Sequence, residues 1–290
     1  MTEGADWDAL VIGAGPAGLT AATYLARYRR RVLVMDGGPA RAEWIPESHN
    51  TPGFPHGIGG PALLARLREQ AITFGASLQA GWVEALGATP HGFVATGAFG
   101  AAVAPTVLLA TGVTDHLPPA PGLEDAIRRS LVRMCPICDG FEATDRRLAV
   151  LGDGELAFRE AAFLRTYAPD ITVLLLGGGG AMAGEALTIA PEDLTFEDER
   201  VVLAAPDGSR AFDHLYLALG CSAQADLAVR AGARQDQIGK LLVDTHQMTS
   251  VPGLYAAGDV VRGLNQIAVG AGEAAIAATA IHNRLRDAGR

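Results

Sequence analysis

The sequence predicts an α/β protein made of two three-layer domains, each with a parallel sheet at its centre. The main observation is a repeated pattern. An apolar run, a glycine-rich turn and a helical stretch follow one another at residues 8–28 and again at 147–167. That order is typical of a buried parallel strand that leads into a crossover helix. With 290 residues, 49% of them apolar, the chain is long enough to form two hydrophobic cores.

Two short apolar runs far from the first pattern complete its domain. Residues 106–109 and residues 253–257 each end at a glycine-containing turn, as buried strands often do. Because these runs flank the second pattern in sequence, we expect a discontinuous first domain of residues 1–115 plus 246–290. Residues 116–245 would form the inserted second domain.

Composition excludes some classes of partner. The formal net charge of −9 argues against nucleic acid or an anionic membrane surface as the main partner. We see neither a signal-peptide pattern nor an apolar run of the roughly 20 residues that span a bilayer, so we expect a cytoplasmic protein without a membrane partner. The sequence has three cysteines, two of them in one Cys-x-x-Cys motif, which indicates redox chemistry or metal binding rather than a disulfide scaffold.

The first pattern has the features of a dinucleotide-binding unit. Residues 8–12 are a strand, residues 13–18 read Gly-Ala-Gly-Pro-Ala-Gly, and residues 19–28 are helical. A second strand, residues 31–35, ends at Asp36, which follows the glycines by about 20 residues as ribose recognition requires. A glycine motif alone could be a turn that binds nothing, but the strands and the placed acid favour a Rossmann-like nucleotide site.

Two distant segments favour FAD as the nucleotide. The strand at residues 106–109 leads into Ala110-Thr111-Gly112, and the strand after residue 253 stops at Gly258-Asp259 before a helix at residues 268–285. With these features the chain resembles flavoproteins with two dinucleotide-binding domains. The resemblance implies that the Gly-Asp pair contacts the ribityl and phosphate region of FAD.

The second pattern departs from a pyridine nucleotide site. Asp153 and Glu155 place two carboxylates in the turn where a pyrophosphate would lie. The next strand ends in Leu176 and a run of glycines, with neither an acid for NAD nor an arginine for NADP. We therefore favour a Rossmann-like domain that has lost its nucleotide, and NAD(P)H binding is doubtful.

The redox motif is Cys135-Pro136-Ile137-Cys138-Asp139. A thiolate at the start of a helix has a lowered pKa and attacks disulfides, and the paired thiol resolves the mixed disulfide. Asp139 can shuttle the proton that the departing thiol needs. Half of a zinc site is the rival interpretation, but it needs two further ligands and the sequence has no second Cys-x-x-Cys.

The order of these motifs resembles low-molecular-weight thioredoxin reductase over nearly the whole chain. Asn50 begins a stretch similar to the family's Asn-x-Pro-Gly, and residues 266–268 stand where the family has Arg-Gln-Ala. The resemblance implies that Cys138 lies against the flavin ring, that Cys135 meets the substrate, and that Asp139 is the acid–base residue. It also implies a homodimer.

One departure bears on the electron donor. Where the family carries His-Arg-Arg-x-x-x-Arg for the NADPH 2′-phosphate, this chain has residues 177–183, which lack arginine. Relatives without the cluster include ferredoxin-dependent flavin thioredoxin reductases and the dithiol oxidases of gliotoxin-like and holomycin-like pathways. Those oxidases tend to have histidine after the second cysteine, so Asp139 favours the reductases.

We therefore expect two electrons to pass between FAD, the cysteine pair and a thioredoxin-like protein, with ferredoxin as a possible donor. The alternatives are an oxidase that turns a small dithiol into a disulfide with O2, and a non-catalytic flavin-binding regulatory or scaffold protein. The candidate catalytic residues are Cys135, Cys138 and Asp139, and no metal ligands are expected. The candidate cofactor-binding residues are Gly13, Gly15, Pro16, Ala17, Gly18, Asp36, Gly37, Asn50, Val83, Ala110, Thr111, Gly112, Gly258, Asp259, Gln266, Ile267 and Ala268.

Overall fold

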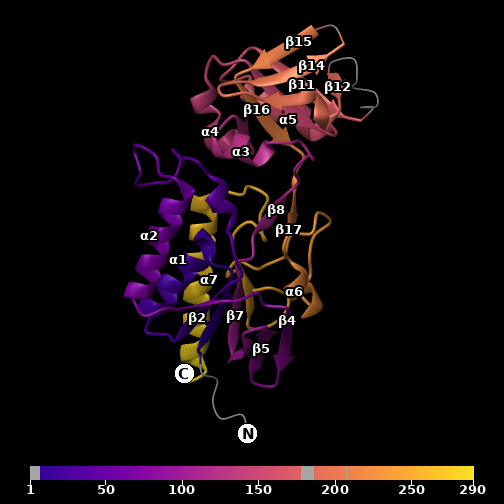
Figure 1. The fold of residues 1–290 in the computed structure, drawn as a ribbon. Coiled ribbons are helices and arrows are strands. Elements are labelled where there is room, and N and C mark those ends of the chain that lie inside the picture. The colour runs from indigo at the N-terminus through magenta and orange to yellow at the C-terminus, as the bar shows by residue number, and fades with distance from the viewer. Residues whose placement is uncertain (1–6, 178–185, 207) are drawn as a thin grey trace. The chain divides into compact units, whose positions relative to one another are not determined.

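The chain folds into two compact units, which the computed structural model describes over residues 7–177, 186–206 and 208–290 (Figure 1). The first unit comprises Met1–Glu43, Gly60–Thr114 and Ser222–Arg290, and the second comprises Trp44–Gly59 and Asp115–Cys221. Each unit is an α/β structure around a parallel sheet, and the first is discontinuous. The predicted fold class is confirmed.

The first unit is built on a five-stranded sheet in the order β18-β7-β1-β2-β3, in which every neighbouring pair is parallel. Ala9 stands opposite both Val32 and Thr106, so the strand that carries the glycine turn is central and flanked on both sides. The strands are β1 (Ala9–Ile12), β2 (Val32–Asp36), β3 (Ser77–Ala80), β7 (Thr106–Leu109) and β18 (Leu254–Ala256).

Helices and a three-stranded antiparallel sheet cover this parallel sheet. The helices α1 (Pro16–Arg27), α2 (Gly60–Thr73) and α7 (Ile267–Asp287) lie together, with α1 packed against both others (Figure 1). Proline at the first position and an Ala- and Leu-rich sequence favour helix in α1. The antiparallel sheet consists of β4 (Ala85–Thr89), β5 (Gly92–Gly97) and β6 (Gly100–Ala104).

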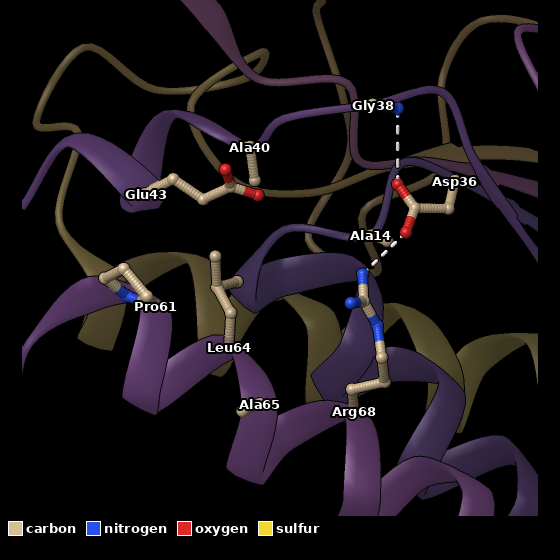
Figure 2. A pocket seen from close by; sticks show the side chains of 9 residues that line it. All are labelled: Ala14, Asp36, Gly38, Ala40, Glu43, Pro61, Leu64, Ala65 and Arg68. Carbon is tan, nitrogen blue, oxygen red and sulfur yellow. Dashed lines mark hydrogen bonds and ion pairs between the residues drawn. The ribbon is translucent and has the colours of Figure 1, made fainter. Parts of the chain in front are cut away.

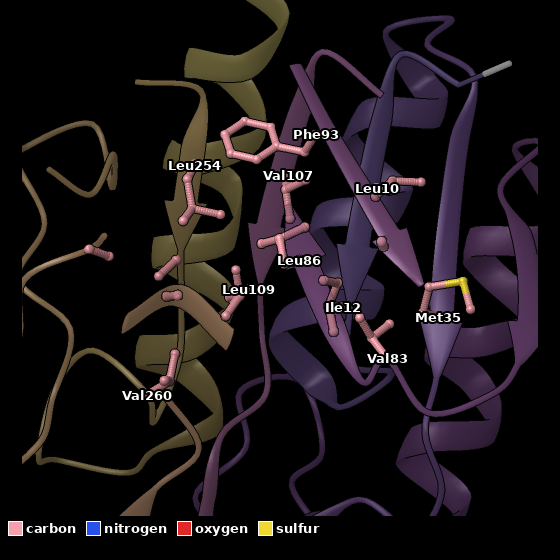
Figure 3. Packing of buried hydrophobic residues seen from close by; sticks show 14 of the residues in the cluster. Leu10, Ile12, Met35, Val83, Leu86, Phe93, Val107, Leu109, Leu254 and Val260 are labelled. Atoms are coloured by element: carbon pink, nitrogen blue, oxygen red, sulfur yellow. The ribbon is translucent and has the colours of Figure 1, made fainter. Parts of the chain in front are cut away.

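One hydrophobic core of the first unit lies between its two sheets. Leu10, Ile12 and Met35 from the parallel sheet pack with Leu86 and Phe93 from the antiparallel sheet (Figure 3). All four residues of β1 are buried, as the continuous apolar run predicted.

Two segments belong to the other compact unit than the predicted domains would suggest, and the domain bounds themselves stay a prediction. Residues 222–245, expected in the inserted domain, belong to the first unit because Ala228 and Leu241 lie in its core and α6 (Asp226–Arg230) packs against β4. Residues 44–59, expected in the first domain, belong to the second unit. Trp44 packs on that unit's core, where the Arg128 guanidinium lies 5.1 Å from the centre of its ring.

The second unit has its own five-stranded parallel sheet in the order β12-β11-β10-β16-β9. Alternate residues of β10 enter two separate cores. Ala149 and Leu151 pack into one, and Leu148 and Val150 into the other, as the period of two in a strand requires. The strands are β9 (Val132–Arg133), β10 (Leu148–Gly152), β11 (Ile171–Leu176), β12 (Leu187–Ile189) and β16 (His214–Ala218).

Short helices and a second small sheet complete the second unit. The antiparallel sheet consists of β13 (Leu194–Phe196), β14 (Val201–Ala205) and β15 (Gly208–Phe212). The helices are α3 (Leu123–Arg128), α4 (Pro136–Asp139) and α5 (Glu155–Leu164), with the 3-10 turns η2 (Phe141–Ala143) and η4 (Pro191–Asp193).

The chain passes between the two units along β8 (Val113–Asp115) and β17 (Cys221–Ala223), which pair with each other, and through η1 (Arg41–Trp44). Among the helices of the described residues, none is long and apolar enough to cross a membrane.

Candidate functional site

The predicted nucleotide-binding residues of the first unit converge at one edge of its sheet. Gly13 follows β1, Asp36 ends β2, Ala110 follows β7 and the Gly258–Asp259 turn follows β18. Because these strands are parallel, their carboxyl ends meet at the same edge, which is where open α/β sheets bind ligands. Four segments that are far apart in sequence therefore form one site.

The three glycines of the first turn have different physical requirements. Gly13 has a φ of 110°, and a Cβ there would lie 2.3 Å from the Ala110 carbonyl oxygen. At Gly18 a Cβ would lie 1.9 Å from the Gly13 carbonyl oxygen. The fold itself therefore requires glycine at both positions.

The fold does not require glycine at position 15. Gly15 has an ordinary φ of −76° as the N-cap of α1, and the nearest atom to an added Cβ is the Ala40 Cβ at 4.0 Å. Open space beside unhindered backbone at a helix start suits a phosphate group, which needs close approach to the N–H groups. Position 15 therefore has room for a phosphate group, and binding of a dinucleotide by this turn stays a prediction.

A pocket lies next to this turn, lined by residues from β2, η1 and α2 (Figure 2). Asp36 Oδ2 accepts a hydrogen bond of 2.5 Å from Arg68 Nη2, and Asp36 Oδ1 accepts one of 3.3 Å from the Gly38 amide. Arg68 also lines the pocket, and its Nε is buried without a hydrogen-bond partner. The lining residues are Ala14, Asp36, Gly38, Ala40, Glu43, Pro61, Leu64, Ala65 and Arg68.

Two buried charges hold the Gly258–Asp259 turn. The Gly258 amide donates a 2.8 Å hydrogen bond to Glu273 Oε2 on α7, and Lys240 Nζ donates a 2.5 Å bond to the Asp259 carbonyl oxygen. Lys240 and Glu273, whose side chains make these bonds, are each only 5% exposed. Neither residue was predicted, although Lys240 stands out as the only lysine in the sequence.

The remaining predicted positions of this unit lie around the same edge. Pro16 and Ala17 begin α1, and Gln266, Ile267 and Ala268 form the start of α7. The Thr111 hydroxyl donates to the Gln224 carbonyl oxygen at 2.6 Å, and Gly112 has a φ of 69° with open space where a Cβ would be.

Two predicted positions are explained by packing. Val83 is buried in the core (Figure 3), so its side chain is not available to a ligand and only its backbone is. At Gly37 a Cβ would lie 2.8 Å from the ring of Trp82, which is 65% exposed. Trp82 was not predicted and places a large aromatic surface directly beside the end of β2.

The second unit contains the predicted cysteine pair. Cys135 and Cys138 form a disulfide with a Cα–Cα distance of 5.3 Å, and Cys135 is the N-cap of α4. The Cys138 amide donates to the Cys135 carbonyl oxygen at 3.0 Å, which closes the small loop. Among the described residues we find no cluster of three or more His, Cys, Asp or Glu side chains that could hold a metal ion.

Asp139 directly follows the pair and contacts two polar side chains, Tyr216 and Arg133. The Tyr216 hydroxyl donates to Asp139 Oδ1 at 3.0 Å, and Arg133 Nη1 lies 3.9 Å from Oδ2. Burial raises the pKa of Asp139 to about 6, against the opposing effects of Arg133 and the Tyr216 hydrogen bond. A carboxyl that titrates near neutral pH can both donate and accept a proton.

Asn50 lies beside the cysteine loop of the second unit. Its Nδ2 donates to the carbonyl oxygen of Ile137, the residue between Pro136 and Cys138, at 3.4 Å. The neighbouring His49 has Nδ1 3.4 Å from Glu142 Oε1. The predicted contact of Asn50 with FAD stays a prediction.

The turn after β10 differs from the turn after β1. Gly152 is required by packing, because a Cβ there would lie 2.7 Å from the Ala157 Cβ. Asp153 and Glu155 are exposed, one on each side of Gly154. Residues 177–183, which stand where the family carries its NADPH 2′-phosphate cluster and which lack arginine, lie outside the described residues apart from Gly177.

Comparison with known proteins agrees with this arrangement. The family model described as pyridine nucleotide-disulphide oxidoreductase matches residues 7–179 and 186–275. A thioredoxin reductase of Mycolicibacterium smegmatis is 31% identical over 278 residues, covering 88% of each chain. The bifunctional thioredoxin reductase/thioredoxin of Mycobacterium leprae is 37% identical over 170 residues, which cover 58% of this chain and 37% of that protein.

Solved structures give the same result. The crystal structure of thioredoxin reductase from Streptococcus pyogenes superposes with a TM-score of 0.86 at 27% identity, over 97% of this chain and 98% of the other. The resemblance to low-molecular-weight thioredoxin reductases is thereby confirmed, and it implies a bound flavin. The chain belongs to the pyridine nucleotide-disulphide oxidoreductase family and is a flavin-dependent disulfide oxidoreductase of the thioredoxin reductase-like type.

Proposed function

We propose that the protein passes two electrons between FAD, the Cys135–Cys138 pair and an external thioredoxin-like protein. The observation that carries the proposal is the disulfide at the start of α4, followed at once by a carboxyl with a pKa near 6. A non-catalytic scaffold protein would not need a redox-active cysteine pair with a proton-exchanging carboxyl next to it. The relatives support the choice of substrate, since one of them is named a bifunctional thioredoxin reductase/thioredoxin.

The residues that would hold FAD are those at the edge of the first sheet. Gly13, Gly15 and Gly18 would admit the pyrophosphate, and Asp36 would accept hydrogen bonds from the adenosine ribose. The Gly258–Asp259 turn, held by Lys240 and Glu273, would face the ribityl and phosphate region. When bound, FAD supplies or accepts the electron pair that reduces or re-forms the disulfide.

The cysteine chemistry proceeds by thiol–disulfide exchange. In the reduced enzyme, the Cys135 thiolate attacks one sulfur of the external disulfide, which breaks that S–S bond and forms a mixed disulfide. Cys138, deprotonated by Asp139, then attacks Cys135 Sγ and releases the second external thiol. The departing thiolates take up two protons, one of them from Asp139, so the external disulfide is reduced and the enzyme disulfide re-forms.

The electron donor is proposed to be something other than NADPH, with ferredoxin as one candidate. Two exposed carboxylates, Asp153 and Glu155, flank the only glycine of the β10–α5 turn that has open space around it. They would repel a pyrophosphate at that position. We also propose that the enzyme works as a homodimer, as its resemblance to low-molecular-weight thioredoxin reductase implies.

An anaerobic reduction experiment tests the proposal. The flavin-loaded protein is mixed in turn with NADPH, NADH and dithiothreitol while flavin absorbance is followed. Bleaching by dithiothreitol alone is the expected result. Rapid bleaching by either pyridine nucleotide would contradict the proposal for the donor. If no dithiol bleaches the flavin, the proposed path through the cysteines is wrong. Rapid reoxidation by O2 after reduction with a small dithiol would favour the oxidase alternative.

A further inference from the structure

Behind Asp139 lies a chain of buried and half-buried polar side chains that the reaction as described does not use. It consists of Arg133 at the end of β9 and His214 and Tyr216 of β16. The Arg133 side chain is only 9% exposed and Tyr216 is fully buried. Buried cations and hydroxyls are costly unless they are paired, so a cluster of this kind next to a redox centre needs an explanation.

We propose that Arg133, Tyr216 and His214 form a positioning network that orients the Asp139 carboxyl and holds it ready to exchange protons with the Cys135–Cys138 pair. This inference rests on the proposed function, because it assigns roles to residues that act through Asp139.

The hydrogen bonds of Arg133 fix the network on one side. Arg133 Nη1 donates to the Asp139 carbonyl oxygen at 2.8 Å, and Nη2 lies 3.2 Å from His214 Nε2. A guanidinium can only donate, so His214 Nε2 must accept and the ring proton must be on Nδ1. Nδ1 lies 3.1 Å from the Ser130 carbonyl oxygen and can donate to it. His214 is therefore neutral, and it orients the guanidinium without adding charge.

The environment of His214 agrees with this assignment. Burial, with the positive charge of Arg133, lowers the pKa of His214 to about 4. The imidazole consequently stays neutral over the pH range in which thiol–disulfide exchange is fast, and it does not compete with Asp139 for the proton.

Tyr216 fixes the network on the other side. Its hydroxyl accepts from Arg133 Nη1 at 3.4 Å and donates to Asp139 Oδ1 at 3.0 Å. Burial raises the pKa of Tyr216, so the group remains a hydroxyl and can donate to the carboxylate. Because a hydroxyl has one hydrogen, the bond to Oδ1 competes with the 3.2 Å contact to the Asp139 carbonyl oxygen. Arg133 satisfies that carbonyl and leaves Tyr216 for the carboxylate.

The groups that set the proton affinity of Asp139 come from each neighbouring element. Arg133 of β9 and the Tyr216 hydroxyl of β16 lower its pKa, while burial and Glu142 of η2 raise it. Helix α5 also packs against α4 and carries Glu160, whose pKa is raised by burial to about 7. Arg133 supplies the positive charge that opposes burial and lowers the pKa of Asp139.

The test measures the pH dependence of disulfide reduction in the full chain. Dithiothreitol reduces the Cys135–Cys138 bond at pH 5 to 9, and free thiols are counted by maleimide trapping and mass spectrometry, a readout that needs no flavin. Each rate is divided by the rate of the same protein carrying Asp139→Asn at the same pH. The ratio is the acceleration due to Asp139, because the ionisation of the dithiothreitol thiols affects both rates equally. The resulting acceleration should be full below about pH 6 and fall above it, because the proton donor is then ionised.

Arg133→Met removes the charge that favours ionised Asp139, so the midpoint of the fall should move up by about one pH unit. Arg133→Lys keeps the positive charge but cannot bond to His214 and Asp139 at the same time. Its midpoint should therefore lie close to the wild-type value. Arg200→Met, at an exposed surface pair with Glu197, is the matched control and should change nothing. Should Arg133→Met fail to fold, Tyr216→Phe removes the 3.0 Å donor without a change of charge and should move the midpoint in the same direction.

If the midpoint of the pH dependence stays unchanged in both Arg133→Met and Tyr216→Phe, while the disulfide is still reduced, the proposed positioning network is wrong. That result would leave the proposed function intact. Failure of the flavin to accept electrons from a dithiol would contradict the proposed function, and the thiol count would still report on the network.

Discussion

The clearest test of the nucleotide site compares alanine substitutions at two glycines of one turn. At Gly18 an added Cβ would lie 1.9 Å from the Gly13 carbonyl oxygen, whereas at Gly15 it would meet nothing closer than the Ala40 Cβ at 4.0 Å. The two substitutions have the same chemistry and lie three positions apart. They should nevertheless fail in different ways, because one position serves the fold and the other serves the ligand.

The structure gives the expected sizes of the effects. Gly15→Ala keeps an allowed backbone and costs about 0.5–1 kcal/mol, the preference for glycine over alanine at an N-cap. In a chain of this size that lowers the Tm of the flavin-free protein by no more than about 3 °C. Gly18→Ala must displace backbone, so its cost in unfolding free energy should reach about 3 kcal/mol or more.

Flavin affinity should separate the two variants further. The methyl group of Gly15→Ala would enter the space that we assign to the pyrophosphate, and Kd for FAD should rise by about 10- to 100-fold, or about 1.4–2.8 kcal/mol. The assay is a fluorescence titration of FAD with flavin-free protein, together with thermal unfolding of the same samples. Wild-type FAD affinity in Gly15→Ala, with a normal Tm, would show that the turn does not hold the pyrophosphate.

Three further outcomes follow from the same structure. Lys240→Met should weaken FAD binding measurably in the fluorescence titration, because the Asp259 carbonyl loses its charged donor, while Arg230→Met, at an exposed surface pair, should not. Glu160→Gln should raise the Tm at pH 8 but not at pH 5. Burial raises the pKa of Glu160 to about 7 in the folded state, so the native protein binds this proton more tightly than the unfolded chain does. The native protein therefore loses stability as the pH rises from about 4.5 to 7, and the neutral glutamine removes that loss. Equal effects at both pH values would contradict the assignment. Cys221→Ser should leave dithiothreitol-driven reduction of the Cys135–Cys138 bond unchanged and lower the thiol count of the reduced protein by one, since Cys221 is outside the disulfide.

The sequence was informative where local pattern and tertiary structure coincide. The strand at residues 106–109 and the glycine turn after β1 were predicted because a buried parallel strand and a φ > 0 turn leave direct marks on residue choice. The segment before residue 246 has only short elements, so its sequence does not indicate which core it joins. Its packing through Ala228 and Leu241 is what places it with the first core.

The polar partners of the site could not be read from the sequence. Arg133, His214 and Tyr216 come from two strands that pair only in the folded protein, and Arg133 lies more than eighty positions from Tyr216. Lys240 and Glu273 likewise meet the Gly258–Asp259 turn through tertiary contacts. Arg68 could not be paired with Asp36 for the same reason, since α2 is brought to the end of β2 by packing against α1.

The central claim is that electrons pass between a dithiol and the flavin through Cys135 and Cys138. The most direct measurement is anaerobic reduction of the flavin-loaded protein by dithiothreitol, followed by flavin absorbance, in the wild type and in Cys138→Ser with Cys221→Ser as the control. Rapid bleaching of the wild type and of the control, with none in Cys138→Ser, is the predicted result. Equal bleaching in Cys138→Ser would show that the electrons bypass the cysteine pair and would contradict the account.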